Sequence, residues 1–165
     1  MILYASEYGT TKQISQELAN LLNCQAYPYD APDLIEKITD TSFLILASDV
    51  LLLKINKGFL RFIKSQKNLI SQKKIGILLV CGSPDDKEIN GVKLGISQYI
   101  PNFPEDIVKQ ALLIKAINGK IDFEITDQHK RMIEIMKGHF LVEPFDATPL
   151  NDLPGIAREI KKKLG

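Results

Sequence analysis

The stretch YASEYGTTKQI, from Tyr4 to Ile14, joins a short apolar segment to a helical pattern through a turn made of hydroxyl residues and one glycine. The segment before this turn, Met1–Ala5, is apolar throughout and predicts a buried strand. Behind the turn, Thr11–Leu22 has apolar residues at helical spacing and predicts an amphipathic helix. A strand followed at once by a helix is the first half of a βαβ unit.

The same alternation of strand and helix continues to the end of the chain. The expected strands are Met1–Ala5, Cys24–Tyr29, Phe43–Ala47, Ile75–Cys81 and Ala111–Asn118, with Ile121–Ile125 as a continuation of the last; the expected helices are Thr11–Leu22, Gly58–Gln66, Pro104–Gln110, Thr126–Lys137 and Asp152–Lys163. Continuous apolar runs are typical of strands that are covered on both faces. The sequence therefore predicts an α/β fold with a doubly wound five-stranded parallel sheet in the order 2-1-3-4-5, in three layers α/β/α.

Composition sets the outer limits on function. The chain has 165 residues, of which 45% are hydrophobic and 25% charged, and this suits one globular domain over residues 1–165. A net charge of +1 gives no field for binding nucleic acid. The longest apolar run, around Val50–Leu53, is too short to cross a bilayer, and no signal peptide is visible. We expect a cytoplasmic protein with Cys24 and Cys81 as reduced thiols, and contact with the inner face of the membrane stays open.

Three connections are the places to look for a ligand. In doubly wound sheets, ligands bind outside the carboxyl ends of the strands, where the strand order reverses. Here that position is lined by the connections Ser6–Thr11, Ser48–Lys57 and Gly82–Tyr99. The part of the chain from Gly82 to Pro104 is expected to be irregular.

The chemistry of the first connection suits a phosphate. A helix start offers free N–H groups and a partial positive charge, and Gly9 lets successive N–H groups converge. Ser6, Thr10 and Thr11 add short hydroxyls. The connection has no Gly-Lys-Ser/Thr ending and no three-glycine fingerprint, which sets it apart from triphosphate and dinucleotide loops. A single phosphate monoester such as that of FMN fits best; an ordinary helix cap is the alternative.

The stretch Tyr4–Ile14 closely resembles the FMN phosphate loop of flavodoxins, with its Ser/Thr-x-x-Gly-x-Thr pattern. The form Tyr-Ala-x-x-Tyr-Gly-x-Thr looks especially like the flavodoxin-domain family that includes menaquinone-dependent protoporphyrinogen oxidase. The layout around Gly119 and the tail after Lys137 is similar as well, so that the resemblance covers essentially the whole chain. It implies a flavodoxin-like fold, noncovalent FMN and redox chemistry carried by the flavin, with no catalytic side chain.

The resemblance also implies which residues bind the cofactor. Those of the phosphate end would be Ser6, Glu7, Tyr8, Gly9, Thr10 and Thr11, and those around the isoalloxazine ring would be Ser48, Asp49, Val50, Leu51, Gly82, Ser83 and Tyr99. No metal site is expected, because His129 and His139 fit no metal-ligand spacing.

The sequence departs from the family at the ring end of the site. It has no Trp, and Val50–Leu53 is aliphatic where relatives have a small residue, a proline and an aromatic residue. These aliphatic side chains would cover the flavin, pack against the sheet, or form a patch for a partner or a lipid quinone. Tyr99 would flank the flavin or join the core, and Cys81 would have a redox role or act as a small buried hydrophobe.

An acidic segment follows the fourth expected strand. Asp85, Asp86 and Glu88 would lower the flavin potential or form a solvated turn.

Three functions remain after these observations. The first is an FMN-dependent oxidoreductase that resembles quinone-linked protoporphyrinogen oxidase, with a redox partner or a quinone. The others are a flavodoxin-type electron carrier and a non-enzymatic binding or regulatory module that has lost FMN.

Overall fold

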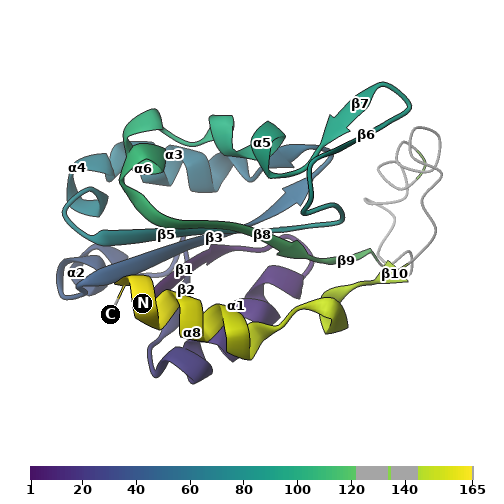
Figure 1. Cartoon of the computed structure of the whole chain (residues 1–165). Coiled ribbons are helices and arrows are strands. Elements are labelled where there is room, and N and C mark those ends of the chain that lie inside the picture. The colour runs from purple at the N-terminus through teal and green to yellow at the C-terminus, as the bar shows by residue number, and fades with distance from the viewer. Residues whose placement is uncertain (122–133, 135–144, 165) are drawn as a thin grey trace.

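The computed structural model describes residues 1–121, 134 and 145–164. Its central sheet is parallel and has the strand order β2-β1-β3-β5-β8 (Figure 1). These strands are β1 (Ile2–Ala5), β2 (Ala26–Pro28), β3 (Phe43–Leu51), β5 (Lys74–Cys81) and β8 (Ala111–Asn118). The predicted order 2-1-3-4-5 is therefore confirmed.

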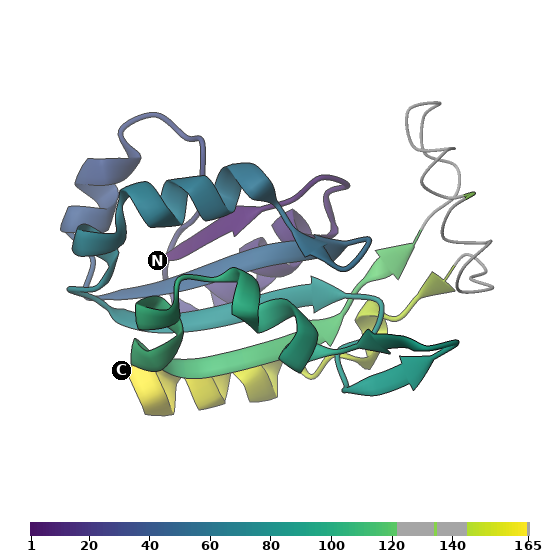
Figure 2. The same ribbon diagram turned by 90° about the horizontal axis from the view of Figure 1, so that it is seen from above.

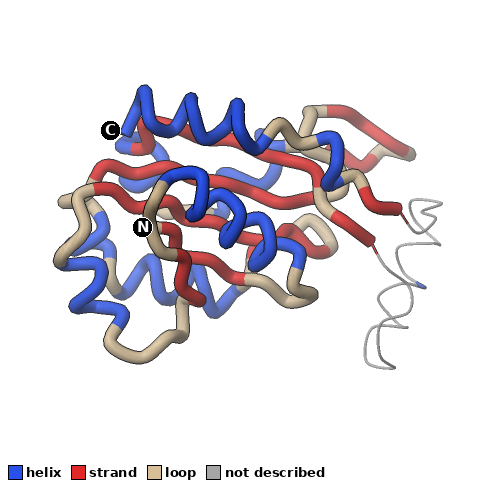
Figure 3. The backbone as a smooth tube through the Cα atoms, turned by 90° about the horizontal axis from the view of Figure 1, so that it is seen from below, coloured by secondary structure: helices blue, strands red, loops and turns tan. Residues whose placement is uncertain are grey.

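Helices cover both faces of the sheet (Figures 1 and 2). One face carries α1 (Thr10–Leu22) and α8 (Leu153–Leu164), which Figure 3 shows in front of the strands. The other face carries α2 (Leu34–Thr39), α3 (Lys57–Ser65), α4 (Lys67–Ile70), α5 (Ile96–Tyr99) and α6 (Glu105–Gln110). The fold thus has the three predicted α/β/α layers.

The alternation of side chains along each strand supplies both cores. In β3, Leu44 and Leu46 join the core beneath α3, whereas Ile45 and Ala47 join the core beneath α1. All four are at most 1% exposed. A strand that is buried on both faces needs apolar residues at every position, and this explains the continuous apolar runs.

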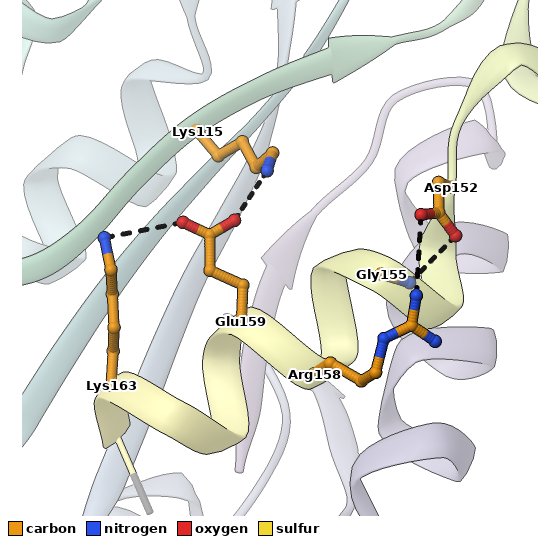
Figure 4. Close-up of polar contacts among 6 residues, drawn as sticks. All are labelled: Lys115, Asp152, Gly155, Arg158, Glu159 and Lys163. Atoms are coloured by element: carbon orange, nitrogen blue, oxygen red, sulfur yellow. Dashed lines mark hydrogen bonds and ion pairs between the residues drawn. The ribbon is translucent and has the colours of Figure 1, made fainter.

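The carboxyl-terminal helix is fixed to the sheet by polar contacts (Figure 4). Lys115 of β8 donates to Glu159 of α8 at 2.7 Å, and Lys163 lies 3.4 Å from the other carboxylate oxygen of Glu159. The N–H of Gly155 donates to Asp152 at 2.8 Å, so that Asp152 caps the start of the helix. The Lys115–Glu159 contact fixes α8 to β8, and α8 packs beside α1.

The third strand is longer than predicted. The expectation of a strand over Phe43–Ala47 followed by a loop from Ser48 was wrong, because β3 continues to Leu51. Pairing with β5 holds the backbone extended up to Asp49 opposite Val80. The chain then turns back, and β4 (Lys54–Ile55) pairs antiparallel with the end of β3.

The prediction that the segment from Gly82 to Pro104 is irregular was wrong, because this segment contains regular structure. Strands β6 (Lys87–Ile89) and β7 (Val92–Leu94) form an antiparallel hairpin, followed by α5 and the 3-10 helix η1 (Ile100–Asn102). Asn90 and Gly91 connect the two strands with φ values of 50° and 76°. Asn-Gly is a preferred pair for such a hairpin turn, because both positions need positive φ.

Several short helices and strands were not predicted from the sequence. Helices α2 and α4 have 6 and 4 residues, too few for a clear helical period. Strand β9 (Lys120–Ile121) pairs with β10 (Phe145–Asp146), and the 3-10 helix η2 (Thr148–Leu150) leads into α8. Apart from Glu134, the expected helix Thr126–Lys137 lies outside the described residues, as do residues 122–125 of the expected strand continuation and both histidines. In the part that the structure describes, no helix is long and apolar enough to cross a membrane.

The core beneath α3 gives a first prediction. Phe59 is fully buried, and its ring lies 5.8 Å from that of Tyr29 and 6.5 Å from that of Phe103. We expect Phe59→Ala to lower the free energy of unfolding by about 3–5 kcal/mol, because it removes apolar contacts and leaves a cavity. Urea denaturation measures this loss. Leu150→Ala, at a position 77% exposed, is the control and should change stability by less than about 0.5 kcal/mol.

Candidate functional site

The connection between β1 and α1 leaves the start of a long helix open. Gly9 precedes α1 with φ of 88°, and no side chain caps the helix. The first helical hydrogen bond runs from the N–H of Gln13 to the carbonyl of Gly9 at 2.9 Å. The N–H groups of Thr10, Thr11 and Lys12 therefore have no acceptor within the helix. The alternative of an ordinary side-chain cap is not what the structure has, since no side chain caps α1 at Gly9 and the Ser6 hydroxyl accepts the N–H of Gly9 itself, at 3.1 Å.

A buried hydroxyl without a partner lies in the first turn of this helix. Thr11 is fully buried, and its Oγ1 has no hydrogen-bond partner among the described residues. Ser15, one turn later, is in the same state. Burying a hydroxyl without a partner costs free energy, and such groups need an explanation. For Thr11, an acceptor bound at the open end of α1 would satisfy the hydroxyl, so the connection fits a phosphate group.

The carboxyl end of β3 brings an acid to the same place. Residues Ile45 and Ala47 face α1, and Asp49 continues this alternation. Asp49 is only 8% exposed, and its Oδ2 accepts the N–H of Glu7 at 2.7 Å. Burial raises the pKa of Asp49, the Glu7 N–H partly offsets this, and the nearby Glu7 carboxylate raises it further. Ser48, fully buried, donates to the carbonyl of Asp49 at 3.0 Å.

The hairpin between β3 and β4 forms the next part of this edge. Its two-residue turn consists of Leu52 and Leu53, with φ values of 47° and 64°. Left-handed conformations are unfavourable for residues of this kind. Val50 and Leu53 are partly buried and pack against the core beneath α3, so this part of the aliphatic segment does pack on the sheet side. Leu51 and Leu52 are half-buried.

The third connection contributes less to the edge than expected. Gly82 is exposed, and Ser83 is buried with its hydroxyl 3.4 Å from the carbonyl of Asp85. The prediction that Tyr99 lies in a loop was wrong. Tyr99 is the last residue of α5, and it is 2% exposed within the core. Burial is also the main reason why the pKa of Tyr99 is raised.

Cys81 is buried, whereas the acidic segment after it is exposed. Cys81 is 3% exposed, and burial raises its pKa to about 11, so that the thiol stays neutral and packs as a small apolar group. Asp85, Asp86 and Glu88 are exposed. Asp86 accepts the N–H of Ser97 at 3.0 Å, which holds the β6–β7 hairpin to the start of α5.

The structure thus joins expected site residues of the first and second connections through the contact of Glu7 with Asp49, and it places Tyr99 in the core. Sequence reasoning did not identify an open groove of about 540 Å³ beside α1, lined among others by Gln13, Glu17 and Asn151. No local signal marks it, because the residues come from opposite ends of the chain. Over residues 1–121, 134 and 145–164, no three His, Cys, Asp or Glu side chains are grouped to hold a metal ion.

Comparison with known proteins assigns the chain to a family. The family model described as a flavodoxin domain matches residues 1–139. No curated protein sequence matches the chain.

Solved structures share the fold at low sequence identity. The flavodoxin of Fusobacterium nucleatum bound to flavin mononucleotide has a TM-score of 0.54 and 14% identity, over 99% of this chain and 97% of that one. A flavodoxin, WrbA-like protein from Agrobacterium tumefaciens has a TM-score of 0.53 and 12% identity, over 98% and 96%. Two-electron reduced flavodoxin of Megasphaera elsdenii has a TM-score of 0.51 and 10% identity, over 86% and 98%. At these identities the likeness shows the fold alone.

The turn between β3 and β4 gives a prediction on stability. Asn tolerates a positive φ better than Leu, so Leu52→Asn relieves backbone strain. We expect it to raise the free energy of unfolding by about 0.5–1 kcal/mol, measured by urea denaturation. Leu150→Asn makes the same chemical change at an exposed position without positive φ and should show no gain. A loss of stability in Leu52→Asn would contradict the assignment of strain.

The raised pKa of Asp49 gives a prediction on pH. Its folded pKa lies above the ordinary value of 3.8, so the folded state binds more protons than the unfolded state between these two values. Asp49 therefore lowers stability as the pH rises through that window, and the loss persists at neutral pH. We expect Asp49→Asn to be more stable than the wild type at pH 7, with a difference that shrinks as the pH falls toward 3.8.

Urea denaturation between pH 3.5 and pH 7 measures this difference. Asp40→Asn changes the same charge at an exposed residue near the start of β3 and should have little effect. A difference that is the same at every pH would show that burial of the Asp49 charge is not its cause.

Proposed function

The chain belongs to the flavodoxin domain family, and from that premise we propose that it binds FMN noncovalently at the carboxyl edge of the sheet and performs flavin-dependent redox chemistry. The observation that carries this proposal is the unpartnered, buried Thr11 hydroxyl behind an uncapped helix start. Both features lack an acceptor, and a phosphate monoester supplies several. In the proposal, residues 1–165 act as one domain.

At the phosphate end, the chain would bind and orient. The N–H groups of Thr10, Thr11 and Lys12 and the hydroxyl of Thr11 would hold the phosphate, with the partial positive charge of α1 behind them. Gly9 keeps the backbone open at a position where φ is 88°. Tyr8 and Ser6, both half-buried, would border the same group.

At the ring end, the chain would exclude water and set the environment of the isoalloxazine. Val50 and Leu51 lie at the end of β3, and Gly82 and Ser83 follow β5 two strands from β1. Bound FMN supplies the transfer of electrons or hydride equivalents. Backbone groups after β3 and β5 would tune its potential, and Tyr99 would act from the core rather than by stacking, since it is 2% exposed.

Among redox roles, we favour a quinone-linked oxidoreductase of the protoporphyrinogen oxidase kind. The sequence pattern at Tyr4–Ile14 resembles that family, and the half-buried leucines of the β3–β4 hairpin offer an apolar contact beside the proposed ring. A plain electron carrier is the second candidate. Quinone and porphyrinogen turnover by the purified flavoprotein, without a protein partner, would distinguish an oxidase from a carrier.

Binding of FMN is tested by absorption spectra and by quenching of flavin fluorescence. We expect saturable quenching with the wild type and at least a tenfold weaker Kd for Thr11→Val, because a hydrogen bond to a charged group contributes about 1.5–3 kcal/mol. Stability should not fall in Thr11→Val, since the lost hydroxyl has no partner in the protein. Riboflavin, which lacks the phosphate, should bind equally to both proteins.

Ser15→Ala is the matched control. It removes the other buried, unpartnered hydroxyl of α1 but lies one turn further from the open end of the helix. Its FMN affinity should equal that of the wild type. Absence of quenching by the wild type at high FMN concentration would refute the flavoprotein proposal and leave the binding module as the function.

A further inference from the structure

The carboxylate of Asp49 occupies part of the connection that the phosphate of FMN would use. Its Oδ2 accepts the N–H of Glu7 at 2.7 Å, and Glu7 lies between Ser6 and Gly9 in that connection. We propose that Asp49 is a specificity-determining residue that couples phosphate binding to the uptake of one proton. The inference rests on the proposed function and adds a chemical condition to it: the site takes a phosphate-bearing flavin tightly only when Asp49 is neutral.

The hydrogen bond itself sets up a competition. The Glu7 N–H lies in the same connection as the proposed phosphate donors Thr10 and Thr11, but it donates at 2.7 Å to Asp49 and is therefore not free to add to a phosphate oxygen. Neither oxygen of an ionised carboxylate can donate, so an ionised Asp49 and a phosphate dianion, the main form of the monoester above about pH 6, could not hydrogen-bond to each other. Once protonated, the same side chain carries an O–H and can donate to phosphate.

Charge acts in the same direction. Asp49 is 8% exposed, and no basic side chain of the described residues forms an ion pair with it. Two negative groups in a partly dehydrated site repel each other more strongly than in water. The helix start favours an anion there, and Asp49 already supplies one. The phosphate must therefore displace the Asp49 carboxylate, or it binds tightly only after that carboxylate has been protonated.

The titratable groups that border Asp49 do not remove this effect. Glu7 and Tyr8 of the first connection interact electrostatically with Asp49. The adjoining elements also contain Lys12 in α1, Lys54 in β4 and Cys81 at the end of β5. Glu7 adds negative charge, Tyr8 has a raised pKa in part because of Asp49, and the Cys81 thiol is neutral with a pKa of about 11. Lys12 and Lys54 are exposed. Burial and the Glu7 charge both favour protonation of Asp49.

The experiment compares FMN with riboflavin between pH 5 and pH 8. Fluorescence quenching gives Kd for the wild type and for Asp49→Asn, which keeps an acceptor for the Glu7 N–H without the charge. At pH 7.5 we expect Asp49→Asn to bind FMN about tenfold more tightly than the wild type, as expected for removal of one adjacent like charge. As the pH falls, the wild type should approach the variant. Riboflavin should bind equally to both at every pH.

Two controls separate this effect from a general change in charge. Asp40→Asn removes one negative charge at an exposed residue before β3 and should leave Kd for FMN unchanged. Glu7→Gln removes the neighbouring charge and keeps the backbone N–H donor, so a pH dependence should remain but shift to lower pH, because the Glu7 carboxylate raises the pKa of Asp49. If Asp49→Asn does not fold, Asp49→Ser replaces it with the same expected result.

Other results would overturn the proposal. Asp49→Asn with the FMN affinity and pH dependence of the wild type would show that Asp49 does not compete with phosphate. An equal gain for riboflavin would show that the effect is not directed at the phosphate.

Failure of the proposed function is recognised separately. If neither protein binds flavin, inorganic phosphate is titrated and the backbone amide of Glu7 is followed by NMR. Tighter phosphate binding by Asp49→Asn than by the wild type then supports the competition without FMN, and equal binding overturns it.

Discussion

The pairing of β1 with β3 is the interaction on which the candidate site depends. Its register places Ile2 opposite Ile45 and Ala5 opposite Ser48, so both strands end at the same level of the sheet. Since the strands are parallel, the turn after β1 and the last residues of β3 then meet although 42 residues separate Glu7 from Asp49. A shift by one residue would turn Asp49 to the other face of the sheet, because side chains alternate along a strand.

At the carboxyl ends of β1 and β3, polar groups lie next to the hydrophobic core. Thr11 is buried without a partner, Asp49 is buried as an acid, and α1 begins without a side-chain cap. Each of these features lowers the stability of the free protein, and each would be offset by a ligand with acceptors and a compensating proton. The rest of the fold, with its apolar strands and paired helices, supplies the stability that this edge lacks.

The two ends of the proposed cofactor site differ in how much the chain has built. The phosphate end is made of one short connection and the end of one strand, and its groups lie within hydrogen-bonding contact of each other. The ring end consists of the strained turn Leu52–Leu53 and the exposed Gly82. The aromatic residue expected there, Tyr99, is in the core. Recognition of the phosphate therefore contributes more to the proposed binding than stacking on the ring, and the charge at Asp49 becomes correspondingly important.

The sequence by itself determined the class of fold, the strand order and the first connection as a phosphate site candidate, because apolar runs, helical spacing and the turn residues around Gly9 are local patterns. It did not determine where β3 ends: Ser48 and Asp49 read as loop residues because they are polar, yet pairing with β5 keeps them in the strand. Nor did the sequence predict the position of Tyr99. It was assigned to a loop, but it belongs to the short helix α5 and is buried in the core. Only the tertiary structure decided that Asp49 receives the Glu7 N–H, since a hydrogen bond between distant segments depends on strand register, which no local pattern specifies.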